Sequence, residues 1–231
     1  VVYRIIYEFD VTDKIKINAE LPDAYNVYIN GMDYSGNRRD FNMIATINTK
    51  THKIVLTTMP RDYYIYVPAY DLNDSLTALG AVDSEISKEA LEQLFGIKID
   101  FTLNLYTESL VKLVDTIGGL EFCSKNSYYT THETTIGSYE DEGEKVYVSK
   151  GCKTYNGSEI LAIARERLRI QKDIKREDND RQITINIIKK IANVDTLMNY
   201  NSLLNSLDGL YTSNINKSVI TNLIQQAIEH P

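Results

Sequence analysis

The stretch YNVYINGMDYSGNRRDFNMIATINTKTHKIVLTTMPRDYYIYVP, residues Tyr25–Pro68, decides the fold. It opens on YNVYIN, a run rich in β-forming residues, which leads into Gly31, Met32 and Asp33. A β-rich run followed by glycine and aspartate is typical of a strand that ends in a turn. We therefore expect a strand over Tyr25–Asn30, with Asp33 in the turn that follows it.

The rest of the stretch predicts a β-hairpin. Met43–Asn48 and Lys53–Met59 are two more β-rich runs, and the polar segment between them is short. Pro60 ends the second strand, because proline cannot donate to a central ladder. Arg61 and Asp62 are therefore expected just past a strand end, in a connection of the kind that often carries site residues.

Helix and strand signals alternate beyond this stretch. Ser87 is the predicted cap of a helix that stops at Gly96. A strand over Ile99–Leu105 is expected next, and then a helix that ends at Gly118 and Gly119. This alternation predicts an α/β fold, in which helices flank a mixed central sheet.

A capping-box pattern opens a helix in the second half of the chain, with Glu159 three residues after Asn156. Arg165 and Arg167 follow it. Residues two apart point in opposite directions on a helix, but in the same direction on an extended segment. If both arginines serve one site, this helix must therefore end near Ala164.

The remaining segments give weaker signals. The polar, tyrosine-rich stretch Ser124–Lys150 is expected to be an exposed, loop-like insertion between strands. A stripe of isoleucines predicts a helix from Arg181 onward. Two further helices, near Asp195–Leu207 and Lys217–Ile228, are expected as packing elements.

Length and composition fit a folded globular domain. The chain has 231 residues, of which 43% are hydrophobic, enough to form a core without metals or cofactors. We expect one domain over residues 23–231, preceded by a peripheral segment over residues 1–22. Every apolar run is far shorter than the roughly 20 residues that a membrane helix needs. Because the chain begins with Val1, we expect a domain excised from a longer protein.

The net charge of −7 disfavours a nucleic-acid or anionic-membrane binder, since such proteins concentrate Lys and Arg on one face. Residues 165–181 are rich in Lys and Arg, but acidic residues are interspersed among them. A charge run of this kind is also typical of a solvated surface. An RNA-binding domain built on this segment is therefore disfavoured, and no nucleic-acid partner is expected.

Arginines and aspartates beside turns are the strongest candidates for chemistry. The sequence has no G-x-S-x-G, P-loop, GxGxxG or HExxH motif, and His52, His132 and His230 are expected to face solvent. Arginine grips phosphate oxygens with two parallel hydrogen bonds, and carboxylates hold the Mg²⁺ that bridges such oxygens. The combination predicts phosphoryl transfer, although surface ion pairs use the same residue types. The candidates are Asp33, Arg38, Asp40, Arg61, Asp62, Arg165, Arg167 and Arg181.

Tyr25–Pro68 resembles the LytR-CpsA-Psr family, with its strand, G-x-D turn, R-x-D, hairpin and P-R-D in order. The resemblance continues through IDFTLNLYTESLVKLVDTIGGLEF (Ile99–Phe122) and TYNGSEILAIARER (Thr154–Arg167), and covers roughly Tyr25–Ala192. It implies an α-β-α sandwich with an apolar tunnel for a polyprenyl chain.

The resemblance also implies an enzyme on the extracellular face of a bacterial cell membrane. Such an enzyme moves a glycopolymer, of teichoic acid or capsule type, from a polyprenyl-pyrophosphate carrier onto peptidoglycan. We expect a Mg²⁺ cofactor, a pyrophosphatase side activity, and a membrane anchor upstream of this chain.

By the same resemblance, Asp33 and Asp40 are expected to hold the Mg²⁺. Asp33 as a mere turn residue, and Asp40 as a salt-bridge partner of Arg38 or Arg39, are the alternatives. Asp62 is expected to orient Arg61, and either Asp40 or Asp62 takes the proton of the attacking hydroxyl. The residues expected to bind the pyrophosphate are Arg38, Arg61, Arg165, Arg167, Arg181 and Gln182.

The chain departs from the family pattern in two places. A Lys and a His that often follow P-R-D are missing from LNDSLTALGA, residues 72–81. Four residues past Arg181, where the family shows a Gln, stands Ile185, and Gln182 is the nearby alternative. These departures are consistent with reduced activity or a different acceptor preference. They also favour a second function: a non-catalytic module that binds polyprenyl phosphate in regulation or assembly.

Cys123 and Cys152 are the two cysteines of the chain, and their spacing does not fit a zinc site. From composition alone they fit either a disulfide in a secreted domain or two free thiols in a cytosolic one. The extracellular location that the resemblance implies favours the disulfide.

Overall fold

The computed structural model of the protein describes residues 24–33, 38–48, 51, 53–81, 83–133, 144–166, 174–191 and 205–216. It divides the chain into two units, of which the first comprises Val1–Tyr106 with Tyr211–Pro231 and the second Thr107–Leu210. The expected segment 1–22 lies outside the described residues, as do nearly all of the helices expected near 195–207 and 217–228.

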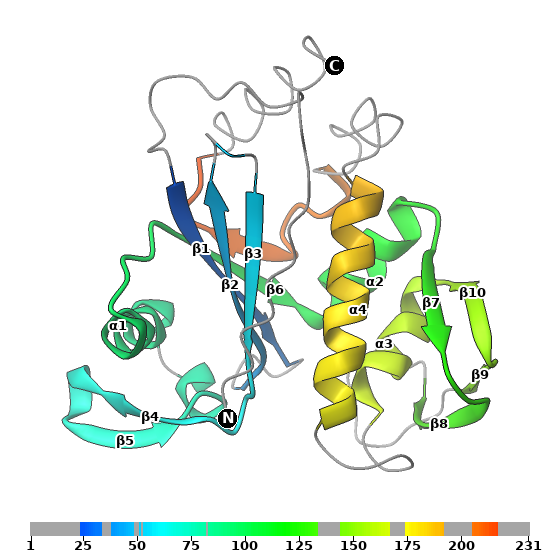
Figure 1. Ribbon diagram of the computed structural model, residues 1–231, viewed down its shortest axis with the longest axis horizontal. Helices are drawn as coiled ribbons and strands as arrows, with labels where there is room; N and C mark the ends of the chain where they lie inside the picture. The colour runs from blue at the N-terminus through cyan, green and yellow to red at the C-terminus, as the bar shows by residue number, and fades with distance from the viewer. Residues whose placement is uncertain are drawn as a thin grey trace, which may run out of the picture. The chain divides into compact units, whose positions relative to one another are not determined.

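In its described residues, the first unit contains a five-stranded sheet in the order β11-β6-β1-β2-β3 (Figure 1). β1 pairs in parallel with β6, whereas the β1–β2, β2–β3 and β6–β11 pairs are antiparallel. The predicted mixed sheet is therefore confirmed, and the three strands expected from the opening stretch form its β1, β2 and β3. The strands are β1 (Ala24–Met32), β2 (Arg39–Asn48), β3 (Lys53–Met59), β6 (Phe101–Tyr106) and β11 (Tyr211–Ser213).

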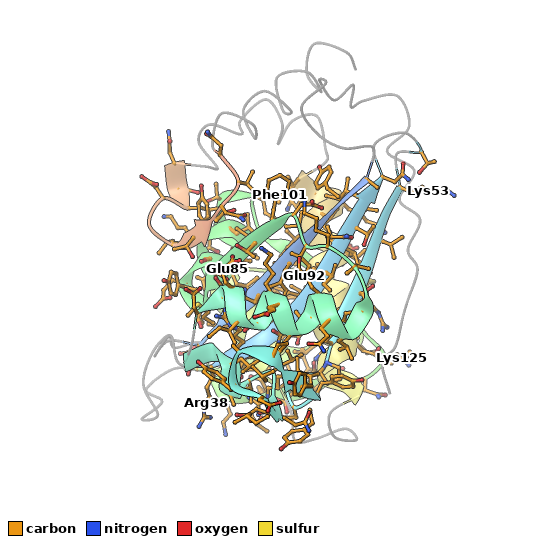
Figure 2. All side chains as sticks on the ribbon, turned by 90° about the vertical axis from the view of Figure 1, so that its left-hand side faces the viewer. Arg38, Lys53, Glu85, Glu92, Phe101 and Lys125 are labelled. Atoms are coloured by element: carbon orange, nitrogen blue, oxygen red, sulfur yellow. A yellow bond between two sulfur atoms is a disulfide. The ribbon has the colours of Figure 1, made fainter. Side chains whose placement is uncertain are left out.

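Helix α1 (Ser84–Phe95) lies across one face of this sheet (Figure 2). Tyr28 and Ile44 point from the sheet into the same cluster as Ala90 and Leu91 of the helix, and all four are buried. Side chains alternate between the two faces of a strand. The other face is consequently formed by apolar residues such as Val27, Met43 and Leu103, which lie between these positions in the register.

The start of α1 differs from the prediction. Its N-cap is Asp83, whose side chain accepts a hydrogen bond from the Glu85 backbone N–H at 3.0 Å. Ser87 lies inside the helix and is fully buried, so the predicted cap is wrong. Aspartate is as good a cap as serine, and the small side chain of Ser87 allows close packing. Gly96 ends the helix in a left-handed conformation, as expected.

The segment between β3 and α1 forms a second, small antiparallel ladder. β4 (Tyr64–Val67) and β5 (Leu72–Ser75) pair, and the 3₁₀ helix η1 (Pro68–Tyr70) joins them. A second 3₁₀ helix, η2 (Ala78–Ala81), leads toward α1. Ile65 and Val67 are buried on the cluster that contains α1, so this ladder is part of the same core.

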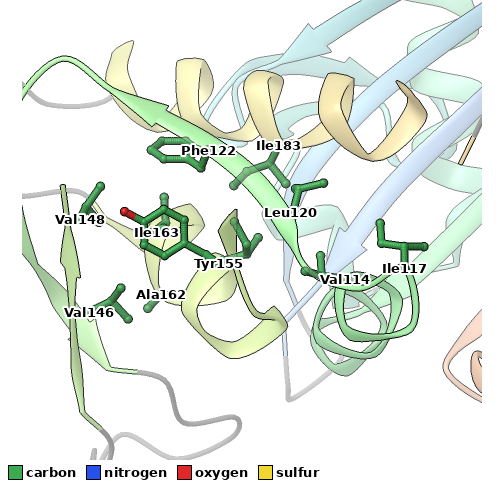
Figure 3. Packing of buried hydrophobic residues seen from close by; sticks show 11 residues of the cluster. Val114, Ile117, Leu120, Phe122, Val146, Val148, Tyr155, Ala162, Ile163 and Ile183 are labelled. Atoms are coloured by element: carbon green, nitrogen blue, oxygen red, sulfur yellow. The ribbon is translucent and has the colours of Figure 1, made fainter. Parts of the chain in front are cut away.

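In its described residues, the second unit contains the helices α2, α3 and α4 and two short β-ladders. β7 (Leu120–Ser124) pairs with β10 (Gly151–Tyr155), and β8 (Tyr128–Glu133) pairs with β9 (Lys145–Val148). Figure 3 shows its core, where Phe122, Tyr155 and Ile163 gather with Ile183 and Leu120. The helices are α2 (Thr107–Thr116), α3 (Gly157–Arg165) and α4 (Ile174–Ile191).

Two predictions in this unit need correction. Ser124–Lys150 is not a loop-like insertion throughout, because its ends form β8 and β9, and Val146 and Val148 are buried in the core. The short alternation KVYV is easily overlooked within a polar segment. The isoleucine helix begins at Ile174 rather than at Arg181, because its first turns are polar.

Cys123 and Cys152 form a disulfide between β7 and β10. Their Cα atoms are directly opposite each other in the antiparallel register.

None of the helices in the described part of the chain is long and apolar enough to cross a membrane.

Candidate active site

The predicted residues of the first unit meet at one end of the sheet. β1 and β6 run in parallel, so their carboxyl ends lie at the same edge, with Met32 opposite Tyr106. β2 begins there, and Arg38 precedes it. Figure 2 shows Arg38 at this end and Lys53, at the start of β3, at the other. Ligands of open α/β sheets bind beyond the carboxyl ends of parallel strands, so this edge is a plausible place for a site.

Asp33 and Arg38 close the link between β1 and β2. The Asp33 backbone N–H donates to the Arg38 carbonyl at 3.0 Å, and the Arg38 N–H donates to Asp33 Oδ1 at 3.1 Å. The Asp33 carboxylate thus shapes the turn, as one of the two interpretations of this residue expects. The same contact places its side chain next to the start of β2.

A β-bulge determines the position of Asp40. Gly31 is paired with Phe41 and Met32 with Arg39, so Asp40 is the additional residue on β2. A bulge bends its strand and changes the direction of the side chain. Asp40 Oδ1 accepts a hydrogen bond from Arg61 Nη1 at 2.7 Å, and the two side chains are 31% and 21% exposed. Arg61 is therefore an ion-pair partner of Asp40, which the sequence alone did not indicate.

Arg61 follows β3 and is held by the backbone of Thr77. The Thr77 N–H donates to the Arg61 carbonyl at 2.8 Å, and the Thr77 carbonyl accepts from the Arg39 N–H at 3.4 Å. Asp62 contributes a longer ion contact, with Oδ1 at 3.6 Å from Arg61 Nε, and is 70% exposed. Residues 72–81, which depart from the family pattern, therefore support Arg61 through their backbone.

Arg39 is a buried residue whose role no sequence motif predicted. It is only 2% exposed, and its Nη1 donates to Asn30 Oδ1 at 2.6 Å and its Nε to the Leu79 carbonyl at 3.3 Å. Asn30 in turn donates to Asn104 Oδ1 at 2.5 Å, and Asn104 donates to Thr212 Oγ1 at 2.9 Å. Burial lowers the pKa of Arg39. Buried polar groups need such partners, and asparagines within apolar strands were the available signal.

The arginine segment lies in the second unit. α3 ends at Arg165, and Glu166 is extended, so the helix ends where a shared role for Arg165 and Arg167 requires. The capping box of Asn156 and Glu159 is present at its start, as predicted. Arg167 lies outside the described residues.

Arg181 and Gln182 both lie on α4 and are engaged there. Arg181 forms an ion pair with Asp178, at 2.6 Å between Nη2 and Oδ1. Gln182 Oε1 accepts from the Cys123 N–H at 2.6 Å, and its Nε2 donates to the Cys123 carbonyl at 3.2 Å. The Gln182 amide thus extends the hydrogen bonding of β7, which is a structural role.

Asp33 and Asp40 suit a hard divalent cation. Both offer carboxylate oxygens at adjacent ends of β1 and β2, and in the described part of the chain no third acidic, histidine or cysteine side chain gathers with them. Mg²⁺ is commonly held by one or two carboxylates, with substrate phosphates and water completing its shell. The donor set therefore fits Mg²⁺ in the presence of a phosphorylated substrate.

The comparison with known families agrees with the motifs. The model of the LytR_cpsA_psr family matches residues 7–230, almost the whole chain. The chain belongs to the LytR-CpsA-Psr family. The match spans both units, so the family resemblance of the opening stretch extends to the helices of the second.

Curated relatives are about a quarter identical to the chain over the aligned residues. It is 26% identical over 209 residues to the polyisoprenyl-teichoic acid–peptidoglycan teichoic acid transferase TagU of Bacillus subtilis, covering 87% of the chain and 63% of TagU. It is 25% identical over 215 residues to biofilm regulatory protein A of Streptococcus mutans, and the alignment covers 85% of the chain and 51% of that protein. An uncharacterized Staphylococcus aureus protein is 26% identical over 72% of the chain. The chain spans 40 to 63% of the lengths of these relatives.

Two solved structures have the same fold as this chain. A protein of Streptococcus agalactiae superposes with a TM-score of 0.76 at 24% identity, covering 90% of this chain and 75% of that one. TagV of Bacillus subtilis superposes with a TM-score of 0.75 at 17% identity, and the superposition covers 90% of this chain and 81% of TagV. The mixed central sheet with its helices is therefore the fold that this chain shares with these two proteins.

Proposed function

We propose that the chain is the catalytic domain of a transferase that moves a glycopolymer from a polyprenyl-pyrophosphate carrier onto peptidoglycan. The observation that carries this proposal is the Asp40–Arg61 pair, at 2.7 Å, beside Asp33 and Arg38 at the end of the sheet. A phosphoryl-transfer site needs cationic donors for phosphate oxygens and carboxylates for a metal ion. The names of TagU relatives in three Bacillus species support teichoic acid as the kind of polymer moved.

Arg61 and Arg38 would bind the oxygens of the pyrophosphate. A sugar hydroxyl of peptidoglycan attacks the phosphorus nearest the glycopolymer, a new P–O bond forms, and the bond to polyprenyl phosphate breaks. The hydroxyl proton passes to a carboxylate, and polyprenyl phosphate leaves. We assign the proton to Asp62, since its 70% exposed side chain is open to an arriving acceptor, whereas Asp40 is paired with Arg61.

Asp33 and Asp40 are the proposed ligands of Mg²⁺. The ion would neutralise charge on the transferring phosphoryl group, as is usual in such reactions. Without an acceptor sugar, attack by water at the same phosphorus would give a pyrophosphatase activity.

In the second unit, we propose that Arg165 and Arg167 form a pyrophosphate clamp and that Arg181 also binds phosphate oxygens. The apolar sheet face opposite α1 has the chemistry that a polyprenyl chain requires, because burial of apolar surface contributes roughly 25 cal/mol per Å². We also propose an extracellular location in a bacterial envelope and an anchor in the longer protein, which the Cys123–Cys152 disulfide supports.

A non-catalytic polyprenyl-phosphate-binding module is the second candidate function. The engaged Gln182 favours it, because this amide is occupied by the β7 backbone. The Asp40–Arg61 arrangement opposes it.

The two functions differ in turnover. The protein is incubated with a short-chain polyprenyl-pyrophosphate disaccharide, peptidoglycan fragments and Mg²⁺, and released polyprenyl phosphate is counted per protein molecule. We expect many equivalents from the wild type and fewer when Arg61 is replaced by Ala. Saturable binding of the lipid with less than one equivalent released would favour the binding module instead.

A further inference from the structure

Glu166 is a buried carboxylate at the exit of α3, and in the sequence it stands between Arg165 and Arg167. It is 9% exposed. Burying a carboxylate is costly unless hydrogen bonds compensate for the lost water. Here they do, because its oxygens accept from the Thr131 backbone N–H and from Thr131 Oγ1, the latter at 3.0 and 3.1 Å.

The end of α3 is fixed from two neighbouring elements. Glu166 ties it to β8 through Thr131, and Asn179 of α4 donates to the Ile163 carbonyl at 3.3 Å. The Glu166 N–H closes the last turn on the same carbonyl, at 3.2 Å. Glu166 itself has φ −63° and ψ 122°, so the chain leaves the helix in an extended direction immediately after Arg165.

We propose that Glu166 is a positioning residue for the pyrophosphate clamp, which fixes the direction in which Arg165 leaves α3 by tying the helix end to β8. The inference rests on the proposed function. A flexible arginine binds phosphate more tightly when its backbone is held in place, because less freedom is lost on binding.

Substitutions can separate the hydrogen bonds that Glu166 accepts from the charge that it carries. Glutamine at position 166 keeps an acceptor and adds a donor for Thr131, but it lacks the charge. Alanine removes both, and valine at position 131 removes only the hydroxyl while keeping the backbone N–H. If anchoring dominates, Glu166→Gln should resemble the wild type, and Glu166→Ala should not.

The test measures the affinity of the full chain for farnesyl pyrophosphate with Mg²⁺ by calorimetry, together with KM and kcat for pyrophosphate hydrolysis. We expect Glu166→Ala to raise Kd and KM about tenfold or more, and Glu166→Gln to stay within about threefold of the wild type. Glu159→Ala is the matched control, because it breaks a 2.8 Å hydrogen bond to the Asn156 N–H at the other end of α3. It should lower the melting temperature and leave Kd unchanged.

Unchanged Kd and KM in folded Glu166→Ala would overturn the inference. So would an equal loss of affinity in Glu159→Ala, because any destabilised α3 would then weaken binding. If Glu166→Ala does not fold, Thr131→Val decides: a raised Kd supports the anchor and a wild-type Kd refutes it. A wild type that does not bind farnesyl pyrophosphate would overturn the proposed function and this inference with it, whereas binding that is insensitive to residue 166 overturns the inference alone.

Discussion

At the scale of single residues, Asp40 and Arg39 are neighbours with opposite environments. The bulge on β2 leaves Asp40 half-buried with Arg61, whereas Arg39 is buried with Asn30. One is therefore suited to a substrate or a metal ion, and the other to holding the strand ends in place.

Asp40→Asn should reduce activity far more than stability. The amide keeps the size of the side chain but removes the charge that a hard cation requires. We expect the release of polyprenyl phosphate to fall about tenfold or more, equivalent to roughly 1.4 kcal/mol of barrier, and the Mg²⁺ concentration needed for half-maximal activity to rise. Rates are measured across a Mg²⁺ series, and melting temperature alongside.

Glu85→Gln is the matched control for this variant. It removes an exposed ion pair of the same kind, at 2.9 Å to Lys88 on α1, away from the proposed site. Both changes should alter the free energy of unfolding by under about 1 kcal/mol. If Asp40→Asn keeps the rate and the Mg²⁺ requirement of Glu85→Gln, Asp40 is only a partner of Arg61.

Arg39→Met should lower stability, because it removes the guanidinium that donates a hydrogen bond to the buried side-chain oxygen Oδ1 of Asn30. An unsatisfied buried polar group costs about 1–3 kcal/mol. Denaturant unfolding measures the loss, with Arg38→Met as the control, because the Arg38 side chain is exposed and should change stability by less than about 0.5 kcal/mol. Equal stability of the two variants would mean that the buried network contributes nothing.

At the scale of elements, strong local signals predicted the structure and weak ones did not. The three strands of the opening stretch and the capping box of α3 were predicted correctly, because β-rich runs and the Asn156–Glu159 spacing act locally. The start of α1 and the β8–β9 ladder were not. In both, tertiary packing decides: Ser87 is buried, and Val146 and Val148 complete a core formed by distant elements.

The Cys123–Cys152 disulfide joins β7 to β10 across a sequence separation of 29 residues. In the chain-entropy model a loop of this size stabilises the folded state by roughly 3–4 kcal/mol. The double variant Cys123→Ser, Cys152→Ser should lose about that much in denaturant unfolding. A reducing agent should destabilise the wild type to the same extent and leave the double variant unaffected; a wild type insensitive to the reducing agent would contradict the pairing.

At the scale of the whole molecule, the family and its fold followed from ordered motifs, and the roles of individual side chains did not. Asp40 was a candidate because of R-x-D, but its pairing with Arg61 depends on a bulge that no motif encodes. Gln182 was expected to bind substrate, and only the structure shows that its amide is hydrogen-bonded to the backbone of β7. Glu166 and Arg39 were passed over, because a charged residue beside a motif gives no sign of burial until the core is known.

The central claim is phosphoryl transfer, in which the phosphorus nearest the glycopolymer is carried to the acceptor. Mass spectrometry of the products from a short polyprenyl-pyrophosphate disaccharide and a peptidoglycan fragment tests it most directly. The account predicts an acceptor heavier by the disaccharide and one phosphate, together with polyprenyl monophosphate. An acceptor that gains the disaccharide without phosphate, with polyprenyl pyrophosphate released, would contradict it.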